Sequence, residues 1–154
     1  MDETLKSKIL ELLAGHRVMT VATLRPDGWP QATTVGYASE GLTLYFLCGR
    51  ESQKAANLAR DNRLSLTIDH DPDNVFTITG LSMAAHAEPV TDHAEGKRIM
   101  QLLAAKYPAD ANLGMTMPEP EQVRLFRVRP KVISLLDYSK GFAHTDLVTL
   151  EDAQ

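Results

Sequence analysis

Residues 43–60 read TLYFLCGRESQKAANLAR, and the residue pattern changes within this stretch from that of a strand to that of a helix. The run LTLYFL at 42–47 is apolar and partly aromatic, which favours a strand. Beyond a Gly-Arg break, Ala55, Leu58 and Ala59 recur at the spacing of a helix. The stretch therefore predicts a strand, a tight turn and a helix.

The start of this predicted helix has the chemistry of an anion site. Ser52 is a good N-cap and would leave several backbone N–H groups of the first turn directed into the bend. The positive end of the helix dipole and the cations Arg50 and Lys54 converge on the same volume, which suits a phosphate. Taken alone, the pattern equally fits a capped surface helix with two solvated cations.

The composition is that of an ordinary globular chain of 154 residues with a formal net charge of -4. One domain spanning 1–154 is the simplest organisation, and the acidic balance argues against nucleic-acid binding. Cys48 is the single cysteine, and the N-terminus lacks the features of a secretory peptide. No apolar run approaches the roughly 20 residues of a membrane span. We expect a cytoplasmic protein without membrane or nucleic-acid partners.

Turn and cap signals divide the rest of the chain into short elements. Gly15 stands where an amphipathic helix at 4–14 would end, and Pro108 would end a second helix that begins near Asp92. Gly80 predicts a bulge or a bend. The predicted strands are 17–24, 29–38, 42–48, 63–69, 75–90, 123–128 and 131–136, with a third helix at 52–60 and a loop at 109–120.

Six or seven antiparallel strands joined by short hairpins predict a mainly β fold of the α+β class. The turns at 25–28 and 39–41 speak against a parallel sheet, which would need crossover helices. We therefore expect a closed or nearly closed barrel over residues 17–136 with helices at its ends, followed by a tail at 137–154.

Motifs for metal binding, hydrolysis and triphosphate binding are missing. The five histidines form no pair at ligand spacing, although His70 stands between Asp69 and Asp71. Cys48 lies in an apolar strand, as small core residues do. There is no G-x-S-x-G and no Walker lysine loop, so hydrolase and NTPase functions are disfavoured.

The run at 21–68 resembles the FMN-binding split barrel of the pyridoxamine 5′-phosphate oxidase-like family, particularly its general-stress-protein branch. The resemblance is carried by Asp27-Gly28-x-Pro30, by Thr33-Thr34-Val35, and by Ser52-x-Lys54 followed by Asn57-Leu58. It extends over residues 17–90 and more loosely beyond. It implies a six- to seven-stranded antiparallel split β-barrel, and a homodimer that holds FMN in the subunit interface.

The resemblance also implies roles for individual residues. Thr33, Thr34 and Val35 would line the isoalloxazine, and Phe46 and Leu47 would flank it. A phosphate site would consist of Arg50, Ser52, Gln53 and Lys54, with Asn74 near polar atoms of the flavin. Many relatives carry arginine at the position of Gln53, and Arg50 would compensate for that lost contact.

The C-terminal region departs from the family pattern. The arginine- and histidine-bearing motif that grips pyridoxamine phosphate is missing, which argues against that activity. Trp29 and the tail residues 138–144 would either reach the flavin of a second subunit or pack on their own barrel. Tyr138 and His144 are the first candidates for an acid or base.

The sequence thus predicts a flavoprotein oxidoreductase of this type that acts on an unidentified small molecule. Two alternatives stay open. One is a non-catalytic, stress-related module that binds flavin without turnover. The other is a split barrel that uses a deazaflavin or haem, although the scattered histidines single out no axial ligand.

Overall fold

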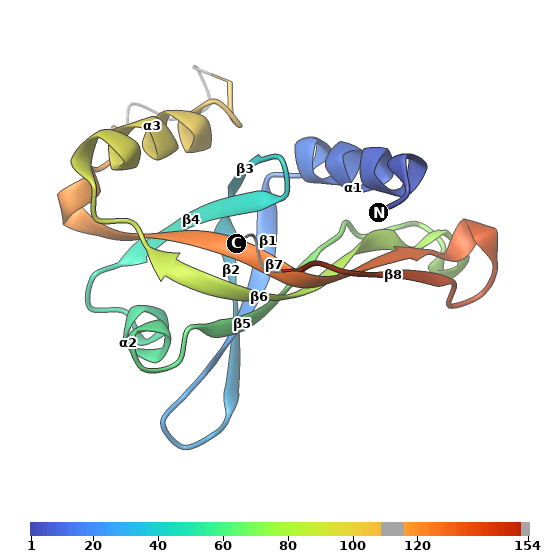
Figure 1. Cartoon of the computed structure of the whole chain (residues 1–154), viewed down its shortest axis with the longest axis horizontal. Coiled ribbons are helices and arrows are strands. Elements are labelled where there is room, and N and C mark those ends of the chain that lie inside the picture. The colour runs from blue at the N-terminus through green and yellow to red at the C-terminus, as the bar shows by residue number, and fades with distance from the viewer. Residues whose placement is uncertain (109–115, 152–154) are drawn as a thin grey trace.

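A curled antiparallel sheet forms the body of the protein in the computed structural model, which describes residues 1–108 and 116–151. Seven strands follow the order β2-β1-β5-β6-β7-β4-β3, and β8 adds to β7 (Figure 1). The predicted mainly β split barrel is confirmed. The strands are β1 Val18–Leu24, β2 Pro30–Gly36, β3 Ala38–Glu40, β4 Thr43–Gly49, β5 Arg63–Ile68, β6 Thr79–Pro89, β7 Val123–Asp137 and β8 Thr145–Thr149.

Three α-helices of the described residues flank the sheet: α1 Glu3–Gly15, α2 Gln53–Arg60 and α3 His93–Ala104. Helix α1 buries Ile9 and Leu13 near the start of β1, and α2 buries Leu58 near its end, so the two helices lie at opposite ends of the barrel. Helix α3 packs instead on the outer side of β3, β4 and β7. Within the described ranges, no helix is both long and apolar enough to cross a membrane.

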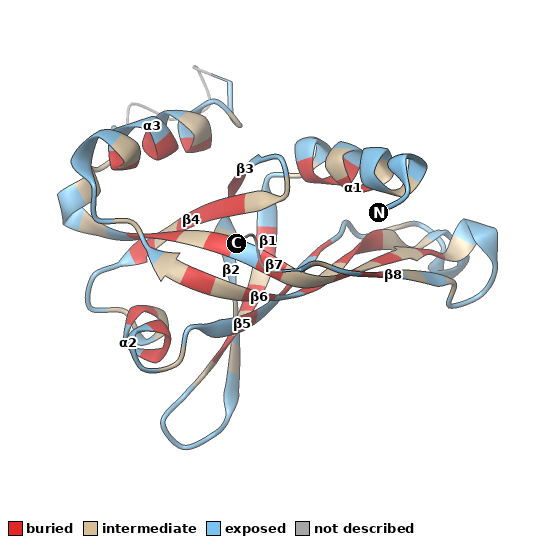
Figure 2. Ribbon diagram, in the orientation of Figure 1, coloured by how far each residue is buried: buried red, intermediate tan, exposed pale blue. Residues whose placement is uncertain are grey.

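The core lies inside the curl because successive strand residues point to opposite faces. In β5, for example, Leu64, Leu66 and Ile68 are buried, whereas the residues between them are exposed. Figure 2 shows the same alternation along the neighbouring strands and the buried sides of the three helices. Among the described residues, no helix covers the outer face of β2, β1, β5 and β6 (Figure 1).

Tyr37 divides what the sequence predicts as a single strand at 29–38. Its ring is fully buried, and its hydroxyl donates a 2.6 Å hydrogen bond to the carbonyl oxygen of Leu13. The chain therefore turns at Tyr37 from β2 into the short β3. This turn lets one continuous segment contribute strands to both ends of the sheet order.

Strand β7 is also longer than predicted, since Pro130 lies within it rather than between two strands. The register between β6 and β7 shifts at Ala84 and Ala85, opposite Pro130. At this shift β7 contains one extra residue relative to β6, Lys131, whereas Gly80, where the sequence predicts a bulge or a bend, pairs in register with Leu136. Proline has no N–H to donate, so a break in the ladder is expected beside it.

Three further boundaries differ from the prediction. The run 75–90 begins with a 3₁₀ turn, Val75–Thr77, before β6. The tail at 137–154 contains another such turn, Tyr138–Lys140, and β8, which pairs with β7. A further 3₁₀ turn, Pro120–Gln122, precedes β7, and most of the loop predicted at 109–120 lies outside the described residues.

Candidate functional site

The candidate site, called the slot below, is the place where the free edges of β2 and β4 come close to each other. These strands stand near the two ends of the sheet order, yet the curl brings them into contact without strand pairing. Strand β3 pairs only with residues 43–45 of β4, so no strand of the described chain pairs with residues 46–49 on that side. The predicted ligand residues at 33–35 and 46–47 thus belong to the two walls of one slot.

The free edge of β2 presents backbone donors and acceptors. Tyr37 N donates to Arg17 O over 3.1 Å and Arg25 N donates to Trp29 O over 3.0 Å, at the two ends of the β1–β2 ladder. Because hydrogen-bonded pairs alternate in an antiparallel ladder, the backbone groups of Thr34 point away from β1. The backbone groups of residues 32 and 36, two positions before and after Thr34, also point away from β1. The side chain of Thr34 is exposed on the outer face.

Thr33 and Val35 point into the barrel. Val35 packs against the core, whereas the Thr33 hydroxyl oxygen is buried without a hydrogen-bond partner in the described part of the chain. An unsatisfied buried polar group costs about 1–3 kcal/mol. A polar ligand atom in the slot would relieve this cost, so the orphaned hydroxyl fits a bound group.

The two predicted residues of β4 point to opposite faces. Phe46 is fully buried and stacks on Phe126 with 5.3 Å between ring centroids. Its ring is inside the core and cannot flank a ligand, which corrects the expectation for this side chain. Leu47 is half-buried on the other face, against the cluster beneath α3. Because the backbone groups of successive residues point to opposite sides of an antiparallel strand, only one of these two residues can direct its N–H and C=O to the free edge of β4.

The first turn of α2 lies just beyond the end of β4 and is electropositive. Ser52 Oγ accepts a 3.1 Å hydrogen bond from Ala55 N, as the sequence predicts for an N-cap. The N–H groups of Gln53 and Lys54 have no acceptor in the described part of the chain, and the turn contains no acidic residue. The half-buried Lys54 ammonium makes no hydrogen bond or ion pair there. This turn can therefore receive an anion.

Two residues of the predicted phosphate site have other partners. Arg50 Nη1 donates a 2.6 Å hydrogen bond to the carbonyl oxygen of Glu121 and lines a small pocket of about 180 Å³ beside the start of α3. Gln53 Nε2 donates over 2.9 Å to Asn57 Oδ1. The Lys54 ammonium is therefore the cation of this turn that has no hydrogen bond or ion pair with the described residues.

Asn57 was part of the recognised motif but had no role assigned from the sequence. Its side chain is fully buried under the barrel. Asn57 Nδ2 donates to Thr23 Oγ1 over 3.0 Å and to Gln31 Oε1 over 3.3 Å. A polar residue between Ala55 and Leu58 on the buried face of a short helix is the signal that could have revealed this network.

Asn74 is not brought to the slot within one chain. Its side chain accepts a 2.9 Å hydrogen bond from Phe76 N and so begins the 3₁₀ turn after β5. The six residues of β5 separate this turn from α2 by about 20 Å. Tyr138 and His144 lie beside the same turn, and His144 Nε2 lies 3.1 Å from Asp146 Oδ2.

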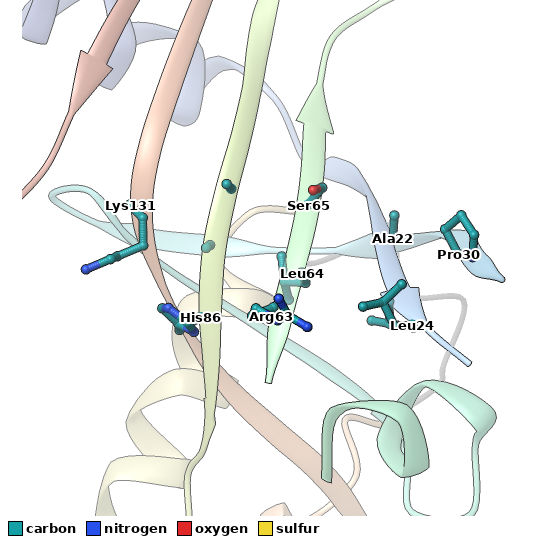
Figure 3. A pocket seen from close by; sticks show the side chains of 11 residues that line it. Ala22, Leu24, Pro30, Arg63, Leu64, Ser65, His86 and Lys131 are labelled. Atoms are coloured by element: carbon teal, nitrogen blue, oxygen red, sulfur yellow. The ribbon is translucent and has the colours of Figure 1, made fainter. Parts of the chain in front are cut away.

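A second hollow, of about 500 Å³, lies on the outer face of the sheet (Figure 3). Its floor is formed by small residues such as Ser65, and its rim carries Arg63, His86 and Lys131. Arg63 Nη2 lies 2.7 Å from Asp61 Oδ2, and this hydrogen bond lowers the pKa of the Asp61 carboxyl to about 2. The basic rim is thus partly neutralised.

Known proteins share this architecture. A family model described as pyridoxamine 5′-phosphate oxidase matches residues 5–137. General stress protein 26 of Bacillus subtilis is 23% identical over 134 residues, which cover 84% of this chain and 94% of that protein.

Two solved structures also resemble this chain in fold. The conserved hypothetical protein Rv2991 of Mycobacterium tuberculosis is 27% identical, with a TM-score of 0.77 and coverage of 99% of this chain and 95% of that one. A heme-binding protein of Mycobacterium smegmatis shares the fold, with 19% identity, a TM-score of 0.75, and coverage of 97% of this chain and 59% of that one. The family predicted from the sequence is confirmed: the chain belongs to the pyridoxamine 5′-phosphate oxidase family of split barrels.

Proposed function

We propose that this protein is an FMN-binding oxidoreductase that passes electrons between the flavin and a small molecule. The observation that carries the proposal is the slot itself. Two unpaired strand edges, one of them bearing Thr34, lead to an uncompensated helix N-terminus with Lys54. FMN matches both parts of this site: the polar edge of its planar ring suits the unpaired strand edges, and its terminal phosphate suits the helix N-terminus.

The flavin would be held by complementary groups at each end. The pyrimidine side of an isoalloxazine alternates acceptors with an N–H donor, and the free edge of β2 offers backbone N–H and C=O groups in alternation. The phosphate would lie at the first turn of α2, where two N–H groups and the Lys54 ammonium would bind it. Redox chemistry would come from the flavin, and the protein would supply position and electrostatics.

We also propose that two copies associate through the outer face of the sheet. Ten outward-facing residues in two adjacent cross-strand rows are small and uncharged. They are Ala22, Ala32, Ser65, Ala84 and Val132 in one row and Thr20, Thr34, Thr67, Ser82 and Ser134 in the other.

A solvated sheet face normally carries long charged side chains, whereas the cores of protein interfaces are depleted in charge. The two uncharged rows are compatible with their own two-fold copy, because no like charges meet across them. Thr34 belongs to this face and to the slot, so the interface would border the flavin. The absence of charge over both rows favours a second copy as the occupant.

Flavin binding is tested with purified full-length protein. We expect FMN to be retained or to titrate in with quenched fluorescence, and the bound flavin to bleach with a nicotinamide donor and recover in air. Protein that never binds FMN would refute the proposal. Binding without reduction by any donor would leave a non-catalytic flavin module.

The interface is tested by light scattering. Thr67→Arg combined with Ala84→Arg would place charges in both rows, and we expect this variant to be monomeric. Ala94→Arg, on the exposed side of α3, is the matched control and should stay dimeric. A wild-type monomer, or a dimer that survives both arginines, would contradict the interface.

Haem binding is a second candidate function, favoured by His86 in the outer hollow. His86 Nδ1 lies 3.2 Å from Asn62 Oδ1, so a neutral ring that donates this bond would leave Nε2 as an axial ligand. Two proteins that share the fold are described as a heme-binding protein and a heme storage protein. Haem titration of the wild type and of His86→Ala distinguishes the two functions, since FMN binding should survive that substitution.

A further inference from the structure

We infer that Asn57 is a positioning residue that keeps the anion-binding turn of α2 at a set distance from the flavin-binding edge of β2. The inference rests on the proposed function and extends it from the residues that touch the cofactor to one that does not. Asn57 is fully buried, and its amide is bonded to groups from three different elements.

The hydrogen bonds of Asn57 connect both halves of the site. On the helix side, Asn57 Oδ1 accepts a 2.9 Å bond from Gln53 Nε2, and Gln53 directly precedes Lys54. On the sheet side, Asn57 Nδ2 donates to Thr23 in β1 over 3.0 Å and to Gln31 in β2 over 3.3 Å. Both N–H groups of the amide are thus used, and one network runs from the phosphate turn to the ring-binding strand.

Apolar contacts alone would define this geometry poorly. Helix α2 has only eight residues, and it inserts few large side chains into the core, chiefly Leu58. A helix of this length is marginal without tertiary contacts. Directional hydrogen bonds from a buried amide restrict sliding and rotation of α2 more tightly than a smooth apolar contact does.

The consequence for binding concerns the phosphate. A ligand gains from contacts at both of its ends only if the protein holds the two subsites at the spacing that the ligand requires. If α2 shifts or rotates, the ring can keep its place on β2 while the phosphate loses its partners. Loss of Asn57 should therefore weaken FMN much more than riboflavin, which has the same ring and no phosphate.

The experiment compares dissociation constants for FMN and riboflavin. Asn57→Leu keeps the approximate shape and removes all three hydrogen bonds. We expect its dissociation constant for FMN to rise about tenfold and that for riboflavin to change less than about twofold. Ala56→Leu, at an exposed position of the same helix, is the control and should change neither. Backbone amides of α2 should also exchange hydrogen faster in Asn57→Leu without ligand.

Thr23→Val provides a second variant if Asn57→Leu fails to fold, because it removes one acceptor of the network at nearly constant volume. It should also lower the preference for FMN over riboflavin. Equal weakening of both flavins, or no weakening in either variant, would overturn the positioning role while the proposed function stands. Wild-type protein that binds neither flavin would refute the proposed function and this inference together.

Discussion

Removal of the Lys54 ammonium should separate the phosphate contribution to flavin binding from the ring contribution. No protein group in the described ranges engages this ammonium, and it stands at the uncompensated first turn of α2. A hydrogen bond to a charged group contributes about 1.5–3 kcal/mol. The side chain is only half-buried, so we take the lower end of that range. Lys54→Ala should therefore weaken FMN about tenfold, since about 1.4 kcal/mol corresponds to that factor.

The assay is quenching of flavin fluorescence on titration with protein. Riboflavin should bind wild type and Lys54→Ala equally, and the difference for FMN should shrink at high salt because the ion contact is screened. Arg50→Ala should have a smaller effect than Lys54→Ala, because Arg50 is bonded to the Glu121 carbonyl. Lys6→Ala, on the exposed side of α1, is the charge-matched control. An unchanged FMN titration in Lys54→Ala would refute the phosphate assignment.

Three further substitutions follow from particular contacts. Thr33→Val removes the unpartnered hydroxyl, so calorimetry should show an apo protein at least as stable as wild type, and titration should show weaker FMN binding. The hydrogen bond from the Ser139 hydroxyl lowers the pKa of the Asp137 carboxyl below its ordinary value of 3.8. The carboxylate therefore stabilises the fold above pH 3.8, and this stabilisation is lost as the pH falls through the pKa of the folded state. Asp137→Asn should thus lower the urea midpoint at pH 7 and change it little at about pH 2; equal losses would exclude this linkage. Gly80→Ala would place a Cβ 2.7 Å from the Ile68 carbonyl oxygen. We expect urea unfolding to show a free energy of unfolding lower by about 1–3 kcal/mol, and an unchanged value would contradict this.

The sequence was sufficient for features that depend on neighbours along the chain. Alternation predicted most strands, Ser52 was recognised as an N-cap, and the order of elements predicted a closed or nearly closed barrel. The family resemblance implied that this barrel is a split barrel. These succeed because strand alternation, turn chemistry and helix capping each involve only a few consecutive residues. The family could be recognised for the same reason, since its motifs are short and lie close together.

The candidate site was predicted only in part, because its residues meet through contacts far apart in the sequence. Alternation already implies that Phe46 and Leu47 face opposite ways, but only the curled sheet shows that the Phe46 face is the core. Arg50 is drawn to a carbonyl 71 positions away, which no local pattern indicates.

The sequence by itself determined the strand-rich composition of the elements, the capped first turn of α2 and the family. Tertiary structure alone decided that the edges of β2 and β4 face each other, that Lys54 rather than Arg50 remains without a protein partner in the described residues, and that Asn57 joins α2 to both β1 and β2. The physical reason is that sheet curvature and the choice of hydrogen-bond partner result from packing of the whole chain. Local preferences constrain each segment, and only closure of the barrel selects which segments meet.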